Sequence, residues 1–280
     1  MRFFRHTWNL IAGLLLPAIL LIIPVHTLHA EDIALGSVAM DIPAAMVKRL
    51  SPLADYLSKE TGMNVTFRAS ADLGSAVDDL GSETTQIAYL TPAAYLEAHE
   101  KYGAIPLVNP LSKGKGTFTL KIAVRNDSPI RKLNDLKGRT FAFGDRKAIL
   151  QPAVVTSAGF RLEDFKSYDY LNHYDNIAKA VLHGDFDAGI LKDSVADKYS
   201  EEGLRIIHTS PALPSYVFAI NRHLNPKAAS KLKKALIMLK DDNDAHRAIL
   251  TALESTYTGF EAAHDKDFNG IRKLLSHSQH

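Results

Sequence analysis

Short apolar runs alternate with amphipathic stretches over most of the chain. The runs with the length and the apolar or alternating character of β-strands are residues 33–38, 64–69, 86–90, 119–124, 140–143, 187–191 and 216–220. The stretches with helical spacing or helix-boundary signals are residues 43–61, 73–80, a segment from 92 onward, 134–138, 152–158, 176–182 and 194–199. Residues 226–275 predict helices only. Strands that alternate with helices predict a mainly parallel sheet, here in two successive α/β units.

One turn between a predicted strand and a predicted helix has the character of an anion site. It spans residues 144–152, between the strand 140–143 and the helix that continues from Pro152. The free N–H groups and partial positive charge of a helix start favour anions there. Arg146 could grip two ligand oxygens and Lys147 could act as a point charge, while Gln151 could hydrogen-bond the ligand. Asp145 is expected to fix the turn. The alternative is a solvated turn.

The first 30 residues predict an export signal. Arg2 and Arg5 precede an uncharged, mostly apolar run over 10–23, and Leu28 to Ala30 offers a cleavage site. We therefore expect residues 1–30 to be removed and the mature protein to be periplasmic. Leu28 is not the small residue preferred at its position, so a retained membrane anchor is the alternative, although the run is shorter than the roughly 20 residues of a spanning helix.

Composition excludes several classes of function. The chain has no cysteine, which rules out disulfides, thiolate metal sites and cysteine nucleophiles. Without residues 1–30 it has 31 basic and 31 acidic residues, so no global positive charge suggests nucleic acid. No histidine pair spaced for a metal and no nucleotide-binding or nucleophile-elbow motif is present. We expect neither a metal nor a cofactor.

Four segments in order carry a resemblance to a known family. They are Leu-Ala-Asp-Tyr-Leu-Ser at 53–58, Gln-Ile-Ala-Tyr-Leu-Thr-Pro-Ala-Ala-Tyr at 86–95, the stretch 128–145 with Asp-Leu-Lys-Gly at 135–138, and Ala-Val-Leu-His-Gly-Asp-Phe-Asp-Ala-Gly at 180–189. The chain resembles the substrate-binding proteins of phosphonate/phosphite/phosphate-type ABC transporters. The resemblance implies a type II periplasmic-binding-protein fold, with two α/β lobes joined by crossover strands around a ligand cleft. The first lobe would hold residues 31–121 plus 216–280, and the second 122–215.

The sequence departs from that family where ligand would be held. The family carries a Ser-Thr-Ser-Gly-like segment after the Gly-Asp pair, but the turn 144–152 is shorter and has no Ser or Thr. Members that bind an aminoalkyl phosphonate use an acid near the return crossover, whereas residues 214–217 have none. A ligand with a primary amine is therefore disfavoured.

The resemblance and the strand ends together give further candidate ligand contacts. Besides the turn residues they are Ser37, Tyr89, Thr91, His173, Tyr174, Asp193 and Tyr216. Each has an ordinary structural alternative: a turn serine, core packing for the tyrosines, a helix cap for Thr91, and an incidental histidine. Asp193 could pair with Arg146 or Lys147, and Asp175 or Asn176 could cap the helix that follows.

The sequence thus predicts a monomeric, non-enzymatic solute-binding protein that captures a small anionic ligand for an ABC transporter permease. The alternative within the same fold is a periplasmic sensor that signals to a membrane receptor. An enzyme on the same scaffold would need paired acid–base groups, which Tyr89, His173, Asp175 and Asp193 could supply, but nothing in their spacing requires this.

Overall fold

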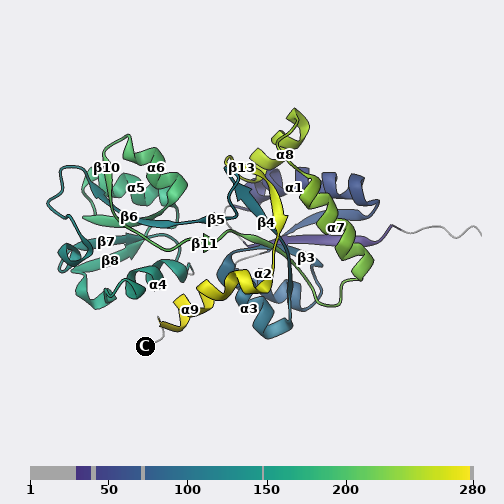
Figure 1. Cartoon of the computed structure of the whole chain (residues 1–280), viewed down its shortest axis with the longest axis horizontal. Helices are drawn as coiled ribbons and strands as arrows, with labels where there is room; N and C mark the ends of the chain where they lie inside the picture. Colours follow the sequence, from purple (N-terminus) through teal and green to yellow (C-terminus); the bar gives the residue numbers. More distant parts are fainter. Residues whose placement is uncertain (1–29, 39–41, 71–72, 147, 278–280) are drawn as a thin grey trace, which may run out of the picture.

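Two separate β-sheets, each flanked by helices, form the body of the protein (Figure 1). The computed structural model describes residues 30–38, 42–70, 73–146 and 148–277. Lys147 and residues 1–29 of the expected export signal lie outside this part. Within the described ranges, no helix is both long and apolar enough to cross a membrane.

The six-stranded sheet and its helices, which we call the first lobe, hold the beginning of the described chain and also its last strand. The strand order is β13-β4-β12-β3-β1-β2. The strands are β1 (Asp32–Ser37), β2 (Asn64–Ala69), β3 (Ile87–Leu90), β4 (Ile105–Ser112), β12 (Val217–Ile220) and β13 (Tyr257–Ala262). The helices are α1 (Pro43–Thr61), α2 (Leu73–Gly81), α3 (Pro92–Tyr102), α7 (Pro226–Met238) and α8 (Asp244–Leu253). Strands β1, β2 and β3 run parallel, while β12 and β13 enter antiparallel to their neighbours.

The five-stranded sheet and its helices, the second lobe, come from one continuous stretch of chain. The strand order is β10-β6-β9-β7-β8. The strands are β6 (Leu120–Arg125), β7 (Thr140–Phe143), β8 (Ser167–Tyr170), β9 (Ala188–Lys192) and β10 (Leu204–Thr209). The helices are α4 (Leu150–Ser157), α5 (Tyr174–His183) and α6 (Asp193–Ser200), with short 3-10 turns η1 (Leu133–Leu136) and η2 (Leu162–Asp164). Strand β7 is parallel to β8 and β9, and β6 is antiparallel to β9 and β10.

A two-stranded ladder connects the lobes. β5 (Thr117–Phe118) leads into the second lobe and β11 (Leu213–Pro214) returns antiparallel to it, with Phe118 opposite Leu213. Both cross the middle of the molecule (Figure 1). Within the described residues, these two neighbouring extended segments carry the chain between the lobes, which is the arrangement of a hinge.

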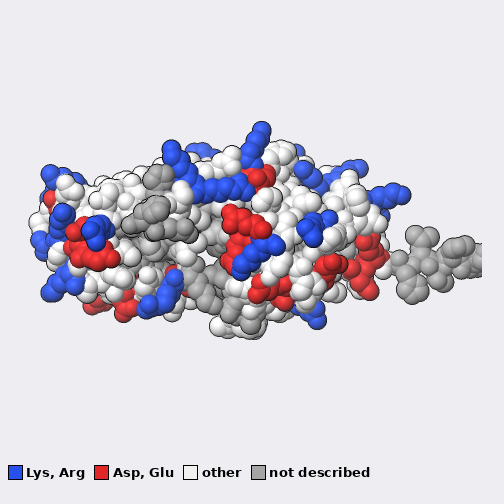
Figure 2. All heavy atoms as spheres, turned by 90° about the horizontal axis from the view of Figure 1, so that it is seen from below, with Lys and Arg blue, Asp and Glu red and all other residues white. Residues whose placement is uncertain are grey.

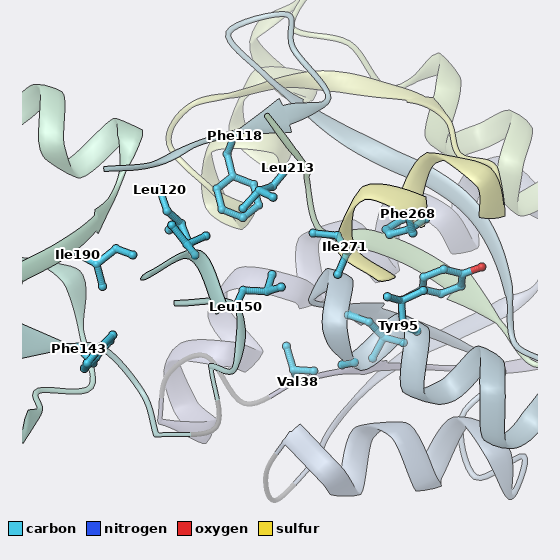
Figure 3. Packing of buried hydrophobic residues seen from close by; sticks show 14 of the residues in the cluster. Val38, Tyr95, Phe118, Leu120, Phe143, Leu150, Ile190, Leu213, Phe268 and Ile271 are labelled. Carbon is cyan, nitrogen blue, oxygen red and sulfur yellow. The ribbon is translucent and has the colours of Figure 1, made fainter. Parts of the chain in front are cut away.

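A C-terminal helix packs across the junction of the lobes. The 3-10 turn η3 (Asp265–Phe268) leads into α9 (Asn269–His277), which contacts α4 of the second lobe and α3 of the first. Ile271 is fully buried and lies between Leu150 of α4 and Tyr95 of α3 (Figure 3). Both lobes therefore share one hydrophobic cluster, and α9 contributes to it.

Local signals explain the elements that the sequence predicted. Thr91 caps α3 by accepting a hydrogen bond from the backbone N–H of Ala94 at 3.1 Å, and Pro92 takes the first helical position. Gly62 ends α1 at φ 70°, a left-handed conformation that favours glycine. The predicted helix boundaries at these points are confirmed.

Two local predictions are wrong. The region 226–275 is not wholly helical, because β13 pairs with β4 inside it. Helix α5 begins at Tyr174, so neither Asp175 nor Asn176 is its cap residue; the Asp175 carboxylate instead accepts hydrogen bonds from Lys198 and Tyr199 of α6. β4, β8 and β10 were also missed. Partly exposed positions break the apolar pattern of β8 and β10, and two prolines interrupt β4.

Candidate ligand-binding cleft

A cavity of about 660 Å³ lies between the two lobes, with walls from both. The residues that contribute to it from the first lobe and its crossover include Val38, Ile42, Arg49, Tyr89, Thr91, Pro92, Ala93, Phe118, Tyr216, Glu254 and Tyr257. Those from the second lobe include Leu120, Asp145, Ala148, Ile149, Leu150, Gln151, Asn172, His173, Tyr174, Asp175, Lys192, Ser194 and Val195.

Five helices begin at this cavity. The cap or first-turn residues that line it are Ile42 for α1, Thr91 and Ala93 for α3, Ile149 and Leu150 for α4, His173 and Tyr174 for α5, and Ser194 for α6. Each helix start carries a partial positive charge and backbone N–H groups that lack an intrahelical acceptor. Their convergence makes the cavity favourable for an anion before any charged side chain is considered.

Three tyrosines form one wall in the first lobe. The hydroxyls of Tyr89 and Tyr257 are 2.5 Å apart, and the Tyr89 ring stacks on Tyr216 with centroids 5.0 Å apart. Burial raises the pKa of all three hydroxyls, so each stays protonated at neutral pH. This wall offers aromatic surface and hydroxyl groups but no charge.

The opposite wall has a fourth tyrosine, Tyr174, and a buried amide, that of Gln151. Gln151 is 3% exposed, and its side-chain oxygen accepts a hydrogen bond of 2.7 Å from the backbone N–H of Gly144. Burial raises the pKa of Tyr174, while the Gln151 amide lowers it and the nearby Asp193 charge raises it further. Tyr174 therefore remains a neutral hydroxyl facing the cavity.

The cations of the cavity differ in how far they are already engaged. Arg49 donates through Nε and Nη2 to the carbonyl of Leu253, and its Nη2 lies 3.6 Å from Glu254. Lys192 follows the buried part of β9, and its ammonium lies 5.7 Å from the centre of the Phe118 ring. Among the described carboxylates, none pairs with Lys192. Lys192 is thus the cation more available to a ligand.

The structure places seven of the predicted contact residues on the cavity wall. They are Tyr89, Thr91, Asp145, Gln151, His173, Tyr174 and Tyr216. Thr91 also caps α3, so this residue both starts a helix and lines the cavity.

Three other predicted residues lie off the wall, and Lys147 is outside the described residues. Ser37 is buried and its hydroxyl donates to the carbonyl of Val38. Arg146 is exposed and stacks over the Tyr170 ring at 4.6 Å. Asp193 accepts backbone hydrogen bonds of 2.8 Å from Thr119 and Ser194 instead of pairing with Arg146.

Sequence reasoning missed several wall residues. Arg49 lies inside a helix whose pattern only indicated burial, and Tyr257 lies on the strand that was predicted to be helix. Lys192 was not among the predicted contacts, whereas the adjacent Asp193 was. The position of Lys192 at the end of a strand, directly before a helix, was the available signal.

Comparisons with known proteins agree with this arrangement. The sequence pattern of the family described as "ABC transporter, phosphonate, periplasmic substrate-binding protein" matches residues 35–268. The phosphate-import protein PhnD of Mycolicibacterium smegmatis is 24% identical over 225 residues, covering 72% of this chain and 70% of that protein.

Two solved structures share the fold. PhnD1 of Prochlorococcus marinus, in complex with methylphosphonate, has a TM-score of 0.74 at 18% identity and covers 88% of this chain and 97% of its own. A binding-protein component of an ABC phosphonate transporter from Pseudomonas aeruginosa has a TM-score of 0.72 at 19% identity, covering 89% and 87%. The two lobes, the crossover ladder and the cavity between them are therefore those of a type II periplasmic binding protein. The chain belongs to the family of periplasmic substrate-binding proteins of phosphonate ABC transporters.

Proposed function

We propose that the cleft captures a small oxyanion of the phosphonate or phosphate class and that the loaded protein delivers it to an ABC transporter permease. The convergence of five helix starts on one cavity carries this proposal. Lys192 supplies a countercharge, and the hydroxyls of Tyr89, Tyr174 and Thr91 supply further polar contacts. The relatives that import phosphate or bind methylphosphonate fall in the same chemical class.

The substituent on the oxyanion is proposed to be small and uncharged. Val38, Ile149 and Leu150 give the cavity apolar surface beside the helix starts. Two of its carboxylates have cationic partners, Glu254 with Arg49 and Asp175 with Lys198. Capture of an amine would have to compete with these pairs, which favours an alkyl or unsubstituted head group over an aminoalkyl one.

Capture is proposed to proceed by closure of the lobes around the β5–β11 ladder. Two of the helix starts, those of α1 and α3, belong to the first lobe, and three, those of α4, α5 and α6, belong to the second. A ligand that contacts starts from both lobes therefore binds the closed form more tightly than the open form. We propose that the mature protein, without residues 1–30, acts as a monomer. We place the boundaries between its lobes at residues 117–118 and 213–214, where the chain crosses from one lobe to the other. This differs from the boundary expected at 121/122, which falls inside β6.

On the face shown in Figure 2, acidic and basic side chains are interspersed, which gives no continuous basic surface there. This accords with a partner that is a small molecule rather than a nucleic acid.

The direct test is ligand binding to residues 31–280, measured by calorimetry and thermal unfolding. Phosphate, phosphite, methylphosphonate, aminoethylphosphonate, sulfate and acetate form the panel. At a hundred times its dissociation constant, a ligand of the native state adds about 2.7 kcal/mol, or roughly 5–10 °C for a protein of this size. We expect that shift from methylphosphonate or phosphate. A panel in which no oxyanion shifts the unfolding midpoint contradicts the proposal.

Replacing the cleft lysine and the turn arginine should have opposite outcomes. Lys192→Ala removes the cation with no described carboxylate partner and should weaken oxyanion binding at least about 10-fold, since one charge-assisted hydrogen bond is worth about 1.5–3 kcal/mol. Arg146→Ala should change affinity less than about 2-fold, because Arg146 stacks on Tyr170 outside the wall. Titration calorimetry of both variants checks this, and equal losses would place Arg146 at the ligand after all.

A further inference from the structure

Asp193, which lies off the cavity wall, bonds the backbone of two neighbouring segments. Its Oδ2 atom accepts a hydrogen bond of 2.8 Å from the backbone N–H of Thr119, and the Thr119 hydroxyl donates to the same oxygen at 3.4 Å. Its Oδ1 atom accepts a bond of 2.8 Å from the backbone N–H of Ser194. In the reverse direction, the backbone N–H of Asp193 donates to the Thr119 carbonyl at 2.9 Å. Asp193 and Thr119 are therefore joined by hydrogen bonds in both directions.

These bonds extend the ladder between β6 and β9 by one pair of residues. Leu120 lies opposite Lys192 at the end of that antiparallel ladder, so Thr119 and Asp193 form the next pair. A paired residue in a regular ladder would return the bond through its backbone carbonyl. The chain enters α6 at Asp193, and the helix turns that carbonyl along its own axis. The carboxylate therefore supplies the acceptor that the strand would otherwise offer to Thr119.

The joined pair connects the crossover to the cleft wall. Thr119 directly follows β5, and Phe118 at the end of β5 lines the cavity. Lys192 and Ser194, the two neighbours of Asp193, line it from the second lobe. The ammonium of Lys192 lies 5.7 Å from the centre of the Phe118 ring. One carboxylate thus fixes the segment that presents Lys192 to the cavity against the first residue after the crossover strand.

We propose that Asp193 is a positioning residue, which directs Lys192 toward the bound oxyanion and does not contact the ligand itself. The inference rests on the proposed function, because Lys192 is taken as the countercharge of that ligand. The charge of Asp193 is unfavourable for an anion bound nearby, since like charges repel. Its contribution to capture is therefore the geometry that its hydrogen bonds impose on the end of β9 and the start of α6.

Replacing Asp193 with asparagine separates the geometry from the charge. Asparagine has almost the same shape but keeps only one acceptor oxygen, so its NH₂ group meets the N–H of either Thr119 or Ser194 and one bond is lost. We expect Asp193→Asn to bind methylphosphonate and phosphate about 3- to 10-fold more weakly, no more than the loss expected for Lys192→Ala. An acid that acts by charge alone predicts the opposite, because its neutralisation would tighten anion binding. Titration calorimetry of the mature protein measures these affinities.

Asp197 provides a matched control on the same helix. Its carboxylate pairs with Lys121 at 2.6 Å, its side chain is 58% exposed, and it lies off the cavity wall. Asp197→Asn removes the same charge but leaves the bonds of Thr119 in place, so affinity should stay within about 2-fold of the wild type. Thermal unfolding of the ligand-free proteins checks that each variant is folded, and Asp193→Ser replaces Asp193→Asn if the latter does not fold.

A double-mutant cycle tests whether Asp193 acts through Lys192. In the Lys192→Ala background the cation to be positioned is gone, so Asp193→Asn should weaken binding less than about 2-fold. Equal weakening in the two backgrounds, or tighter binding by Asp193→Asn alone, overturns the inference and leaves oxyanion capture in place. A Lys192→Ala variant that binds as well as the wild type overturns it too. If the wild-type protein binds neither ligand, the proposed function itself is wrong.

Discussion

Ala93→Asp should abolish oxyanion capture while leaving the fold intact. Ala93 occupies the second position of α3, directly after Thr91 and Pro92, and lines the cleft. A carboxylate about 6 Å from a bound anion, at an effective dielectric constant of about 20, opposes it by about 3 kcal/mol, or roughly a hundredfold in affinity. The same carboxylate is favourable for the helix, because acidic side chains stabilise a helix start. Calorimetry should show lost binding, and thermal unfolding an unchanged or slightly raised midpoint.

The chain contains a matched control for this substitution. Lys227 follows Asn225 and Pro226 at the start of α7, the same cap-proline-residue order as at α3, and it is exposed. No residue of α7 lines the cleft. Lys227→Asp should therefore leave affinity within about 2-fold of the wild type, given the screening of exposed charges. If both aspartates weaken binding alike, the effect is one of net charge and the role assigned to the helix starts is wrong.

Ile271→Ala should be among the most destabilising single substitutions outside the two sheets. The Ile271 side chain is fully buried in the cluster that α9 shares with α3 and α4 (Figure 3). Truncating such a side chain to alanine typically costs about 2–5 kcal/mol. Denaturant unfolding should show this loss in the ligand-free protein.

The neighbouring residue provides the control. Gly270 is exposed on the same helix, and a Cβ added there meets no atom within 4 Å. Gly270→Ala should therefore be neutral or stabilise by up to about 1 kcal/mol, because alanine favours helix more than glycine does. If Ile271→Ala is also near neutral, α9 is not anchored to the junction as described.

The sequence predicted those parts of the fold that depend on local chemistry. The Thr91-Pro92 cap and the glycine that ends α1 satisfy helix termini within a few residues, and both boundaries are confirmed. The strand β13 could not be found in this way, because it exists through pairing with β4, about 150 residues earlier in the chain. A short segment that follows two helices has no local feature that predicts pairing with a distant strand such as β4.

The candidate site shows the same division. Tyr89 and Gln151 stand at the junction of a strand or turn with a helix, and that position alone directs them to the cavity. Arg146 shares the turn but points to the ring of Tyr170, and only the position of β8 reveals this. The positive charge of Arg146 made it a candidate for binding an anion. The direction of a long side chain, however, depends on its tertiary neighbours.

The continuity of the second lobe has a consequence for how new ligand preferences could be built. All five strands of its sheet lie between β5 and β11, whose paired ends meet as Thr117 opposite Pro214. Such a segment can be exchanged as a cassette between relatives, with the cut points in one short ladder. The graft would import three of the five helix starts at once and keep the other two. Among the contacts between the exchanged segment and the rest of the chain, the face of α4 that packs against α9 would have to be matched most closely.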